Sequence, residues 1–467
     1  MTLSLGPDTV DTYTGRVYLA AAQGRLEPRG GDWWFDPNPL FFVDVNNWTP
    51  GTPLVLTADT PGYPVKTLGE LPDGDWSLQA VIRTNNRRAS ALRGGGTVHC
   101  RPVRVPVKGM AEAALTLDRI EPHRSVIRPG SGMALFEHKS ELLSRHFGTP
   151  FALHAVVRMP KGHDGTTALP TLYVIGGFPG AVGSASMVPW LYGPQADADQ
   201  VAIVYLEAEY RGGHSVFADS PAGGPWGTAL VSELLPALEA AFPLRSDRDG
   251  RFLTGHSSGG WASLWLALEH PNVFGGTVST SPDPVDFAGF QTVDIYAPEA
   301  NIYTSPDGTD APVARRSGRV MATARNFIAI ESIMGEGGQM RSFEWTFSPR
   351  GDDGLPVPLW DRATGSIDPA VAEHWRKYDI ADRIRREWDT LAPVLRDRVL
   401  IIMGESDTFY LDAAARTLDA ELTARGLPDV VELIPGDHSS VLTPAVAKRT
   451  LARLLKIATP ADQPTQP

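Results

Sequence analysis

The sequence predicts a protein in which a small β-sandwich precedes an α/β domain with a mostly parallel sheet. Short alternating apolar segments, separated by Gly, Pro, Asp and Asn, occupy residues 1–118 without a helical pattern between them. From residue 119, short and continuously apolar strands alternate with helical segments, which is typical of a parallel sheet covered by helices. At 467 residues the chain is also longer than one hydrophobic core normally serves. We therefore expect domains over residues 1–118 and 119–458, followed by a flexible tail over 459–467 that is rich in Pro and Gln.

Alternation of apolar and polar residues predicts the strands of the first domain. Its expected strands cover residues 15–20, 40–45, 54–57, 76–84 and 97–105. Because turn residues separate them at short intervals, two packed antiparallel sheets are the favoured arrangement.

Apolar runs of strand length and helical periodicity predict the elements of the α/β domain. The expected strands cover residues 151–159, 171–175, 201–206, 252–253, 399–403 and 430–434. The expected helices cover residues 229–241, 258–268, 411–425 and 444–457. The alternation stops over residues 282–392, where we expect an insertion that caps the carboxyl edge of the sheet, with a surface elaboration as the alternative. Within it, a helix over 322–334, a strand over 345–347 and a further ordered segment over 380–391 are expected.

Composition argues against several classes of function. The formal net charge of -12 opposes a nucleic-acid interface, which needs clustered Lys and Arg. Cys100 is the only cysteine, so no intrachain disulfide can form, and a buried structural thiol is expected. No apolar run reaches the roughly 18 residues of a membrane span. The first ten residues lack the pattern of a signal peptide, so we expect a cytoplasmic protein, or a secreted or periplasmic one if a signal peptide was removed.

The strongest motif is Gly255-His256-Ser257-Ser258-Gly259, a Gly-x-Ser-x-Gly pattern between an expected strand and an expected helix. Glycine at both ends permits a sharp backbone turn that exposes the serine, and the helix N-terminus favours developing negative charge. Only Ser257 fits the spacing, because Ser258 would require glycine at position 256. In this context the pattern is typical of the nucleophile elbow of an α/β hydrolase. It predicts Ser257 as the nucleophile, with a turn that has no chemical role as the alternative.

A serine hydroxyl needs a base, and in this fold the acid and the histidine follow the serine along the chain. Three histidines do so: His270, His374 and His438. His270 ends the helix of the elbow, about three turns from the serine, and His374 lies in the expected insertion. His438 follows the last expected strand, at the carboxyl edge where sites of such sheets form. We therefore prefer His438.

The acid is expected after the preceding strand, where Gly404-Glu-Ser-Asp-Thr-Phe-Tyr410 offers two carboxylates. We prefer Asp407, which lies further into the loop, and keep Glu405 as the reserve. The acid would orient the histidine and stabilise the imidazolium. Asp437 is interpreted as a turn residue, because neighbouring side chains diverge.

Acyl transfer also requires donors for the oxyanion. The backbone N–H of Ser258 is one candidate, because it follows the nucleophile directly. The second is expected from the turn after the strand over 171–175, namely the N–H of Gly177 or of Phe178. Between these two amides the sequence does not choose.

With these residues assembled, the chain resembles the esterase group of the α/β-hydrolase superfamily that includes enterochelin esterases, feruloyl esterases and S-formylglutathione hydrolases (esterase D). Besides the elbow, the resemblance rests on Met159-Pro-Lys-Gly162, on Phe217-Ala-Asp-Ser220 followed by Gly224-Pro-Trp-Gly227, and on Ser281-Pro-Asp-Pro-Val-Asp286. It implies an α/β-hydrolase fold over about 140–456 and the triad Ser257, Asp407 and His438. The N-terminal β-domain and the long insertion depart from the usual pattern of the group.

Within these segments, Asp219, Trp226 and Asp286 are candidates for the wall of a substrate pocket, with structural roles in turns as the alternative. The favoured function is hydrolysis of a small-molecule carboxylic ester through an acyl-enzyme, with no metal and no organic cofactor. A serine peptidase or an acyltransferase could use the same triad. A non-catalytic glycan-binding protein is the alternative from another class, with Trp33, Trp34, Phe35, Phe41 and Phe42 as its aromatic platform. The sequence leaves the oligomeric state open, a homodimer being one option.

Overall fold

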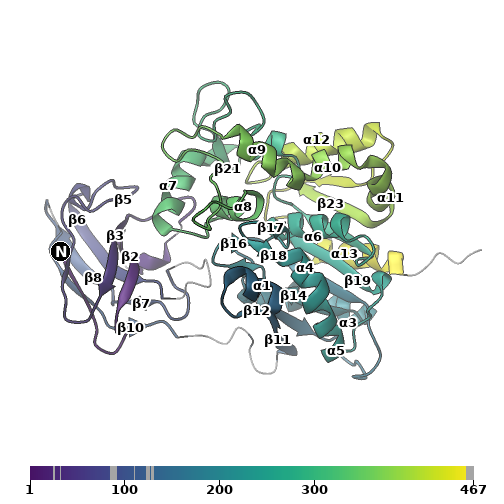
Figure 1. Cartoon of the computed structure of the whole chain (residues 1–467), viewed down its shortest axis with the longest axis horizontal. Helices are drawn as coiled ribbons and strands as arrows, with labels where there is room; N and C mark the ends of the chain where they lie inside the picture. Colours follow the sequence, from purple (N-terminus) through teal and green to yellow (C-terminus); the bar gives the residue numbers. More distant parts are fainter. Residues whose placement is uncertain are drawn as a thin grey trace, which may run out of the picture. The chain divides into compact units, whose positions relative to one another are not determined.

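A computed structural model describes residues 1–24, 27–31, 33–84, 92–109, 111–122, 127 and 131–458. The predicted tail over 459–467 lies outside these residues. The chain divides into two compact units (Figure 1). Unit 1 comprises Met1–Ser125 and Asn326–Gly338, and unit 2 comprises Val126–Arg325 and Gln339–Pro467. The predicted boundary at residue 118 therefore lies short of the observed one, and a piece of the expected insertion belongs to the first unit.

The described strands of unit 1 form two sheets. The smaller sheet has the order β4-β1-β9, with β1 antiparallel to β4 and parallel to β9. The larger sheet has the order β10-β7-β6-β2-β3-β5, and β8 also pairs with β6. The strand bounds are β1 Thr2–Leu5, β2 Tyr13–Gln23, β3 Leu40–Trp48, β4 Leu54–Val55, β5 Gly62–Tyr63, β6 Gly74–Ile82, β7 Val98–His99, β8 Val103–Val107, β9 Ala114–Leu117 and β10 Arg119–Ile120.

Both sheets contribute to one apolar cluster, because alternate side chains of each strand point inward. Leu3 and Leu117 enter it from the smaller sheet, and Leu19 and Leu78 enter it from the larger one. Cys100 is buried in the same cluster, and burial raises the pKa of its thiol to about 11. This thiol therefore stays protonated near neutral pH, as expected of a structural cysteine.

The aromatic residues considered as a glycan platform pack into unit 1. Phe41 is fully buried, Trp33 is 8% exposed, and the Trp34 ring lies 5.6 Å from that of Phe327. Phe42 packs beneath the guanidinium of Arg16 at 4.1 Å. Phe41 and Trp33 therefore contribute to the core, whereas Trp34 and Phe42 are only partly buried.

The main sheet of unit 2 is mostly parallel and has the order β11-β12-β14-β13-β19-β20-β23-β24. Strand β12 runs antiparallel to β11 and to β14, and the pairs from β14 through to β24 are parallel. The bounds are β11 Met133–Ser140, β12 Phe151–Arg158, β13 Thr171–Ile175, β14 Ala202–Leu206, β19 Arg251–His256, β20 Gly276–Thr280, β23 Val399–Gly404 and β24 Val431–Ile434. From β13 the chain adds β14 on one side and then crosses over to add β19 on the other side. The strand order therefore reverses at β13, and parallel sheets place their sites at such a point.

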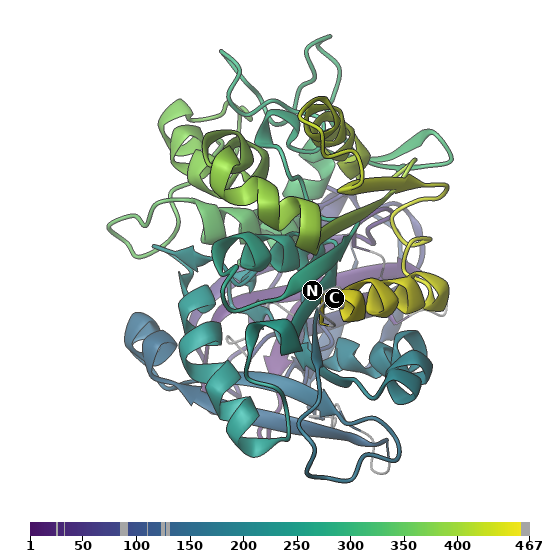
Figure 2. The same ribbon diagram turned by 90° about the vertical axis from the view of Figure 1, so that its right-hand side faces the viewer.

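Helices cover both faces of this sheet, as Figure 2 shows. Apolar residues of α2, α3 and α13 join those of the strands in one cluster on one face. Helix α6 follows β19 and is buried along almost its whole length. The helix bounds in unit 2 are α1 Glu141–Phe147, α2 Val188–Leu191, α3 Gly193–Asp199, α4 Trp226–Ala229, α5 Leu235–Ala241, α6 Ser258–Glu269, α8 Gln339–Phe347, α9 Pro369–Trp375, α10 Ile380–Arg386, α11 Trp388–Arg398, α12 Leu411–Ala424 and α13 Pro444–Ala458. A π-helical turn over Leu230–Leu234 connects α4 to α5. The sheet order and its helical layers give unit 2 the α/β-hydrolase fold.

The region between β20 and α11 contains short hairpins and helices. Strands β21 (Pro312–Arg316) and β22 (Arg319–Thr323) form one hairpin, and α7 (Ala324–Met334) follows directly. The predicted strand over 345–347 is wrong, because these residues form the last turn of α8. Their alternation covers three residues only, and burial of Phe343 and Trp345 in the interior favours the helix. Two further strand pairs in unit 2 stand apart from the main sheet: β15 (Glu209–Tyr210) pairs with β16 (Gly213–His214), and β17 (Asp219–Ser220) pairs with β18 (Gly224–Pro225).

Candidate active site

Ser257 occupies a strained turn between β19 and α6. Its backbone has φ 59° and ψ -124°, a conformation that non-glycine residues rarely adopt. The turn is fixed on both sides, because the N–H of Ser257 donates to Thr280 O at 3.0 Å and its carbonyl accepts from Asp283 N at 3.2 Å. Such strain is typical of functional sites, and it places the side chain at the carboxyl edge of the sheet.

The glycines of the motif are required by close packing. A Cβ atom at Gly255 would lie 2.0 Å from the carbonyl oxygen of Gly259, and one at Gly259 would lie 2.0 Å from that of Ile175. These contacts are far shorter than van der Waals distances. The absence of a side chain at Gly255 therefore lets the elbow fold tightly on itself, and the absence at Gly259 lets it approach the end of β13.

His438 and Asp407 form a buried pair at the ends of neighbouring strands. The Nδ1 atom of His438 lies 2.7 Å from Oδ2 of Asp407, and the Asp407 side chain is fully buried. The other oxygen of Asp407 accepts from the N–H of Phe409 at 2.8 Å, and the Phe409 ring packs edge-on against His438 at 4.9 Å. The carboxylate therefore holds Nδ1 and leaves Nε2 as the nitrogen that can exchange a proton with substrate or nucleophile.

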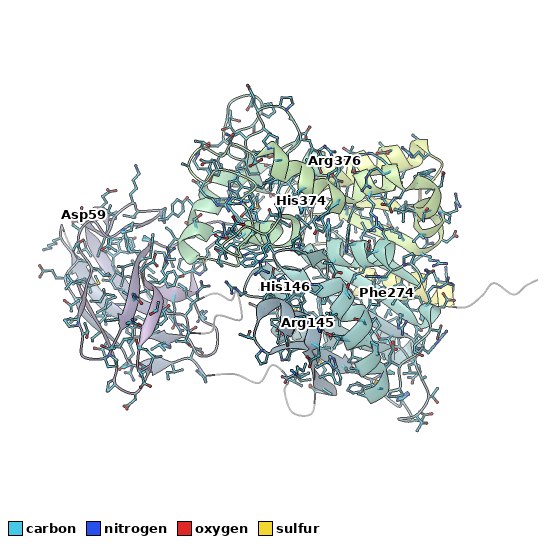
Figure 3. The ribbon with its side chains drawn as sticks, viewed as in Figure 1. Asp59, Arg145, His146, Phe274, His374 and Arg376 are labelled. Carbon is cyan, nitrogen blue, oxygen red and sulfur yellow. The ribbon has the colours of Figure 1, made fainter. Side chains whose placement is uncertain are left out.

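The other residues weighed for the acid and the base have different surroundings. Glu405 is exposed, and its backbone carbonyl accepts from Arg416. Asp437 accepts from the N–H groups of Ser439 and Ser440, as in a turn. Of the other two downstream histidines, His270 follows α6, and His374, labelled in Figure 3, lies on α9. Among the described residues, neither forms a hydrogen bond or an ion pair with Asp407.

The side chain of Ser257 faces a carboxylate that sequence reasoning did not select. Its hydroxyl donates to Oδ1 of Asp283 at 3.4 Å, and within the described part of the chain it makes no hydrogen bond to His438. His438 lies close by, since its ring is 4.6 Å from that of His256, the residue before the nucleophile. Burial and the nearby His438 lower the pKa of His256 well below its usual value, so this neighbour stays neutral. The structure thus brings the three predicted triad residues to one edge, with the hydroxyl turned toward Asp283.

The predicted oxyanion turn lies against the elbow. A Cβ atom at Gly177 would lie 3.1 Å from Cβ of Ser257 and 3.7 Å from its Oγ, so this backbone borders the nucleophile. The carbonyl of Gly176 is hydrogen-bonded to Nε2 of His214 at 2.9 Å, and burial lowers the pKa of His214 to about 4. A neutral imidazole therefore fixes the turn that carries Gly177 and Phe178.

Ser258 opens helix α6, so its N–H belongs to the first turn, where no intrahelical acceptor exists. Its hydroxyl donates to Oδ2 of Asp283 at 2.6 Å. The backbone amide is thereby placed beside the nucleophile, while the side chain is held by the same carboxylate that faces Ser257.

The three candidates for a pocket wall have the contacts of structural residues. Trp226 is 2% exposed, its ring packs 5.1 Å from that of Tyr210, and its indole N–H donates to Gly223 O. Asp219 accepts from the N–H of Thr228 at 2.9 Å. Asp286 forms an ion pair with Arg385 at 2.6 Å. Such contacts in turns and packing are the alternative that the sequence left open, and Asp219 also borders the cavity described next.

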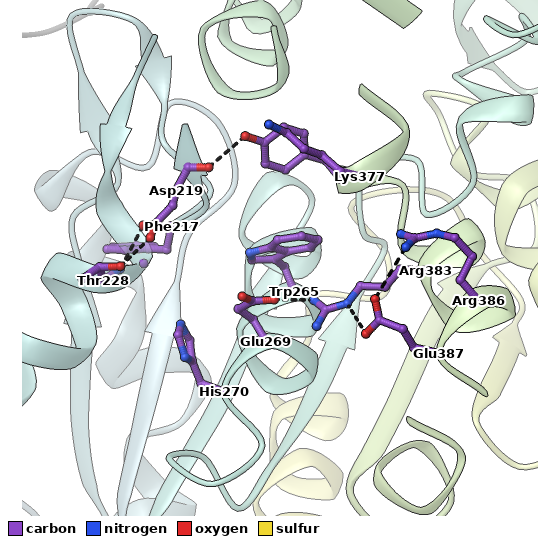
Figure 4. A pocket seen from close by; sticks show the side chains of 12 residues that line it. Phe217, Asp219, Thr228, Trp265, Glu269, His270, Lys377, Arg383, Arg386 and Glu387 are labelled. Carbon is purple, nitrogen blue, oxygen red and sulfur yellow. Dashed lines mark hydrogen bonds and ion pairs between the residues drawn. The ribbon is translucent and has the colours of Figure 1, made fainter. Parts of the chain in front are cut away.

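A separate cavity of about 500 Å³ lies at the far end of α6 (Figure 4). Its wall includes Asp219, Trp265 and His270, and the guanidinium of Arg383 forms ion pairs there with Glu269 and Glu387. None of Ser257, Asp407 and His438 lines it.

Two kinds of site are not found in the residues that the structure describes. No group of three or more His, Cys, Asp or Glu side chains is arranged to hold a metal ion. No helix is long and apolar enough to cross a membrane.

The chain is similar to several solved structures at low identity. A fluorophosphonate-binding serine hydrolase of Staphylococcus aureus is 16% identical, covers 70% of this chain and 98% of its own, and has a TM-score of 0.39. An S-formylglutathione hydrolase from Agrobacterium tumefaciens is 16% identical over 71% of this chain and 98% of its own, with a TM-score of 0.42. A ferulic acid esterase from Anaeromyces mucronatus is 13% identical over 70% and 94%, with a TM-score of 0.37.

No curated protein matches the sequence. A family model does: the one described as "Putative esterase" matches residues 149–441, which is more than half of the chain and includes the elbow, the acid loop and His438. The protein therefore belongs to this esterase family of the α/β-hydrolase superfamily and is a carboxylic ester hydrolase.

Proposed function

We propose that Ser257, His438 and Asp407 are the catalytic triad and that this esterase works through an acyl-enzyme. The observation that carries the proposal is the buried hydrogen bond of 2.7 Å between Asp407 and His438, beside a serine held at φ 59°. A carboxylate on Nδ1 fixes the tautomer whose Nε2 accepts a proton, and a strained elbow exposes the hydroxyl.

In the first step, Oγ of Ser257 forms a bond with the carbonyl carbon of the ester while its proton passes to Nε2 of His438. The carbonyl π electrons move onto oxygen, and this oxyanion is held by the N–H of Ser258 and by that of Gly177 or Phe178. The C–O bond to the alcohol then breaks, and the leaving oxygen takes the proton from His438.

Water completes the cycle by the same route in reverse. It gives a proton to His438 as its oxygen attacks the acyl carbon, and the bond to Oγ breaks as Ser257 recovers the proton. The products are a carboxylic acid and an alcohol, and a small-molecule ester is the substrate class. No step needs a metal or an organic cofactor.

The variant Ser257→Ala tests this proposal. We expect turnover of p-nitrophenyl acetate to fall on the order of 10⁶-fold, because the covalent route is lost, while the circular dichroism spectrum stays that of the parent. Ser186→Ala, which removes an exposed hydroxyl outside the site, is the matched control. Full activity in the folded Ser257→Ala protein would refute the triad.

The choice of acyl acceptor separates esterase action from the alternatives with the same triad. We propose water as the acceptor, so matched ester and amide substrates, each with and without added alcohols, should give the free acid fastest from the ester.

We also infer that unit 1 is a β-sandwich, because its two sheets share one core. We infer that the parts of 282–392 within unit 2 cap the site, because Gln339 contacts Ser258. Cytoplasmic localisation and a homodimer stay predictions.

A further inference from the structure

Asp283 is a buried carboxylate that touches the nucleophile. It lies in the loop after β20 and is 4% exposed. Its Oδ1 lies 3.4 Å from Oγ of Ser257, and its Oδ2 accepts from Ser258 at 2.6 Å. Gln339, the first residue of α8, places Nε2 3.4 Å from the same Oδ2. Three donors, two at the start of α6 and one at the start of α8, therefore converge on one side chain.

The negative charge of Asp283 is not neutralised by a lysine or an arginine in the described part of the chain. Among the described residues, no Lys or Arg side chain forms an ion pair or a hydrogen bond with it. Burial raises the pKa of Asp283 to about 6, while the hydroxyl of Ser258 and the nearby His438 oppose that rise. The carboxylate is therefore ionised above about pH 6, in a setting where an unpaired charge is costly. A buried acid kept at such a cost beside a nucleophile is typical of a functional group.

The sheet places Asp283 between the nucleophile and the acid. Strand β20 lies between β19, which ends at the elbow, and β23, which leads to Asp407. The charged or titratable groups that act on Asp283 are His438 and Asp407, and the remaining groups in contact with it are neutral. Asp407 holds Nδ1 of His438, so Asp283 is a second carboxylate in the field of the same imidazole.

We propose that Asp283 is a positioning residue of this site: it holds the Ser257 hydroxyl in the free enzyme and, as a second carboxylate, stabilises the imidazolium of His438 during catalysis. This inference rests on the proposed triad. When substrate binds, the hydroxyl turns from Asp283 to His438, and its proton passes to Nε2 as Oγ bonds to the carbonyl carbon. Asp283 takes no proton in this step. Its negative charge remains beside the positive charge that forms on the ring.

The variant Asp283→Asn removes the charge and keeps the shape, so the pH dependence of catalysis tests the proposal. We expect kcat for p-nitrophenyl acetate to fall about 10-fold on the alkaline plateau with KM within about 2-fold, because the imidazolium that forms on His438 loses one of two nearby negative charges. We also expect the acid limb of kcat/KM to move to lower pH, because the variant no longer favours the protonated imidazole. A residue with a purely structural role would not move that limb.

Asp419→Asn, which removes one negative charge on α12, is the matched control and should leave both the plateau and the acid limb in place. Thermal unfolding of each variant shows whether it is folded. The proposal is overturned if folded Asp283→Asn keeps the parent plateau, or loses activity with an unmoved acid limb. Failure of the triad itself is distinguishable, because then Ser257→Ala would retain the turnover of the parent.

Discussion

Close contacts around Ser257 leave little freedom for single residues. Gly177 borders the nucleophile so closely that an added Cβ would lie 3.1 Å from Cβ of Ser257. The backbone of Gly177 does not have a positive φ, so alanine there would not strain the backbone. Its methyl group would instead crowd the side chain of Ser257. The hydrogen bond from His214 to the preceding carbonyl limits how far the turn can yield.

Gly177→Ala should therefore impair catalysis more than folding. We expect kcat for ester hydrolysis to fall by up to about 10²-fold, the loss that a displacement near 1 Å produces at a reacting centre. The melting temperature should change little. Gly289→Ala, where the added Cβ meets Ala414 at an ordinary 3.7 Å, is the control. Unchanged kcat in Gly177→Ala would argue against this turn as part of the oxyanion site.

In unit 2, a short strand was predicted most accurately where it is buried and continuously apolar. The expected strand over 171–175 coincides with β13 (Thr171–Ile175). In contrast, β20 reads Gly-Thr-Val-Ser-Thr and has one strongly apolar residue, so it escaped notice although it is buried throughout. Asp283 was not predicted as a site residue for the same reason. An acid can be assigned to the carboxyl edge of the sheet only if the strand before it is recognised. Asp407 was found because β23 is apolar.

A hairpin of the insertion supports the acid loop. Arg315 of β21 donates from Nε to the carbonyl of Asp407 at 2.9 Å and forms an ion pair with Asp412 at 2.6 Å. Its guanidinium also stacks over the Tyr410 ring at 4.5 Å. These three contacts hold the acid loop against β21. A planar guanidinium can make all three at once, which the ammonium of a lysine cannot. No sequence pattern linked residue 315 to residue 407.

Arg315→Ala should loosen this loop and misplace Asp407. We expect kcat to fall about 10-fold with little change in KM, because the orientation of His438 suffers and the binding of the ester does not. Arg315→Lys should restore only part of the loss. Steady-state kinetics measure both. Arg319→Ala, at an exposed position of β22, provides the comparison; a loss as large as that of Arg315→Ala would show that the effect is not specific to the loop contact.

At the scale of the whole molecule, the chain passes between its two units more often than the sequence indicates. Residues 326–338 follow the β21–β22 hairpin and precede Gln339, yet by their contacts they belong to unit 1. Ile330 and Ile333 join its apolar cluster, and the carbonyl of Met334 accepts from Tyr18 at 2.8 Å. Hydrophobic periodicity predicted a helix here but could not identify the surface that it covers.

Ile330→Ala tests this packing. Ile330 is 2% exposed, so we expect the variant to lower the free energy of unfolding of unit 1 by about 2–5 kcal/mol, the usual cost of removing a large buried aliphatic side chain. Urea unfolding followed by tryptophan fluorescence measures it. Val320→Ala, at a position that is 54% exposed, should cost much less. Equal small effects in both variants would contradict the assignment of residues 326–338 to unit 1.

Labelling with a fluorophosphonate probe tests most directly whether Ser257 is an activated nucleophile. Oγ of an activated serine displaces fluoride from the phosphorus of the probe and forms a stable phosphonate ester, while the hydroxyl proton passes to a positioned base. We predict that the parent protein is labelled stoichiometrically, that peptide mass spectrometry places the adduct on Ser257, and that Ser257→Ala is not labelled. An unlabelled folded parent protein, or an adduct that persists at another serine in Ser257→Ala, would contradict the assignment.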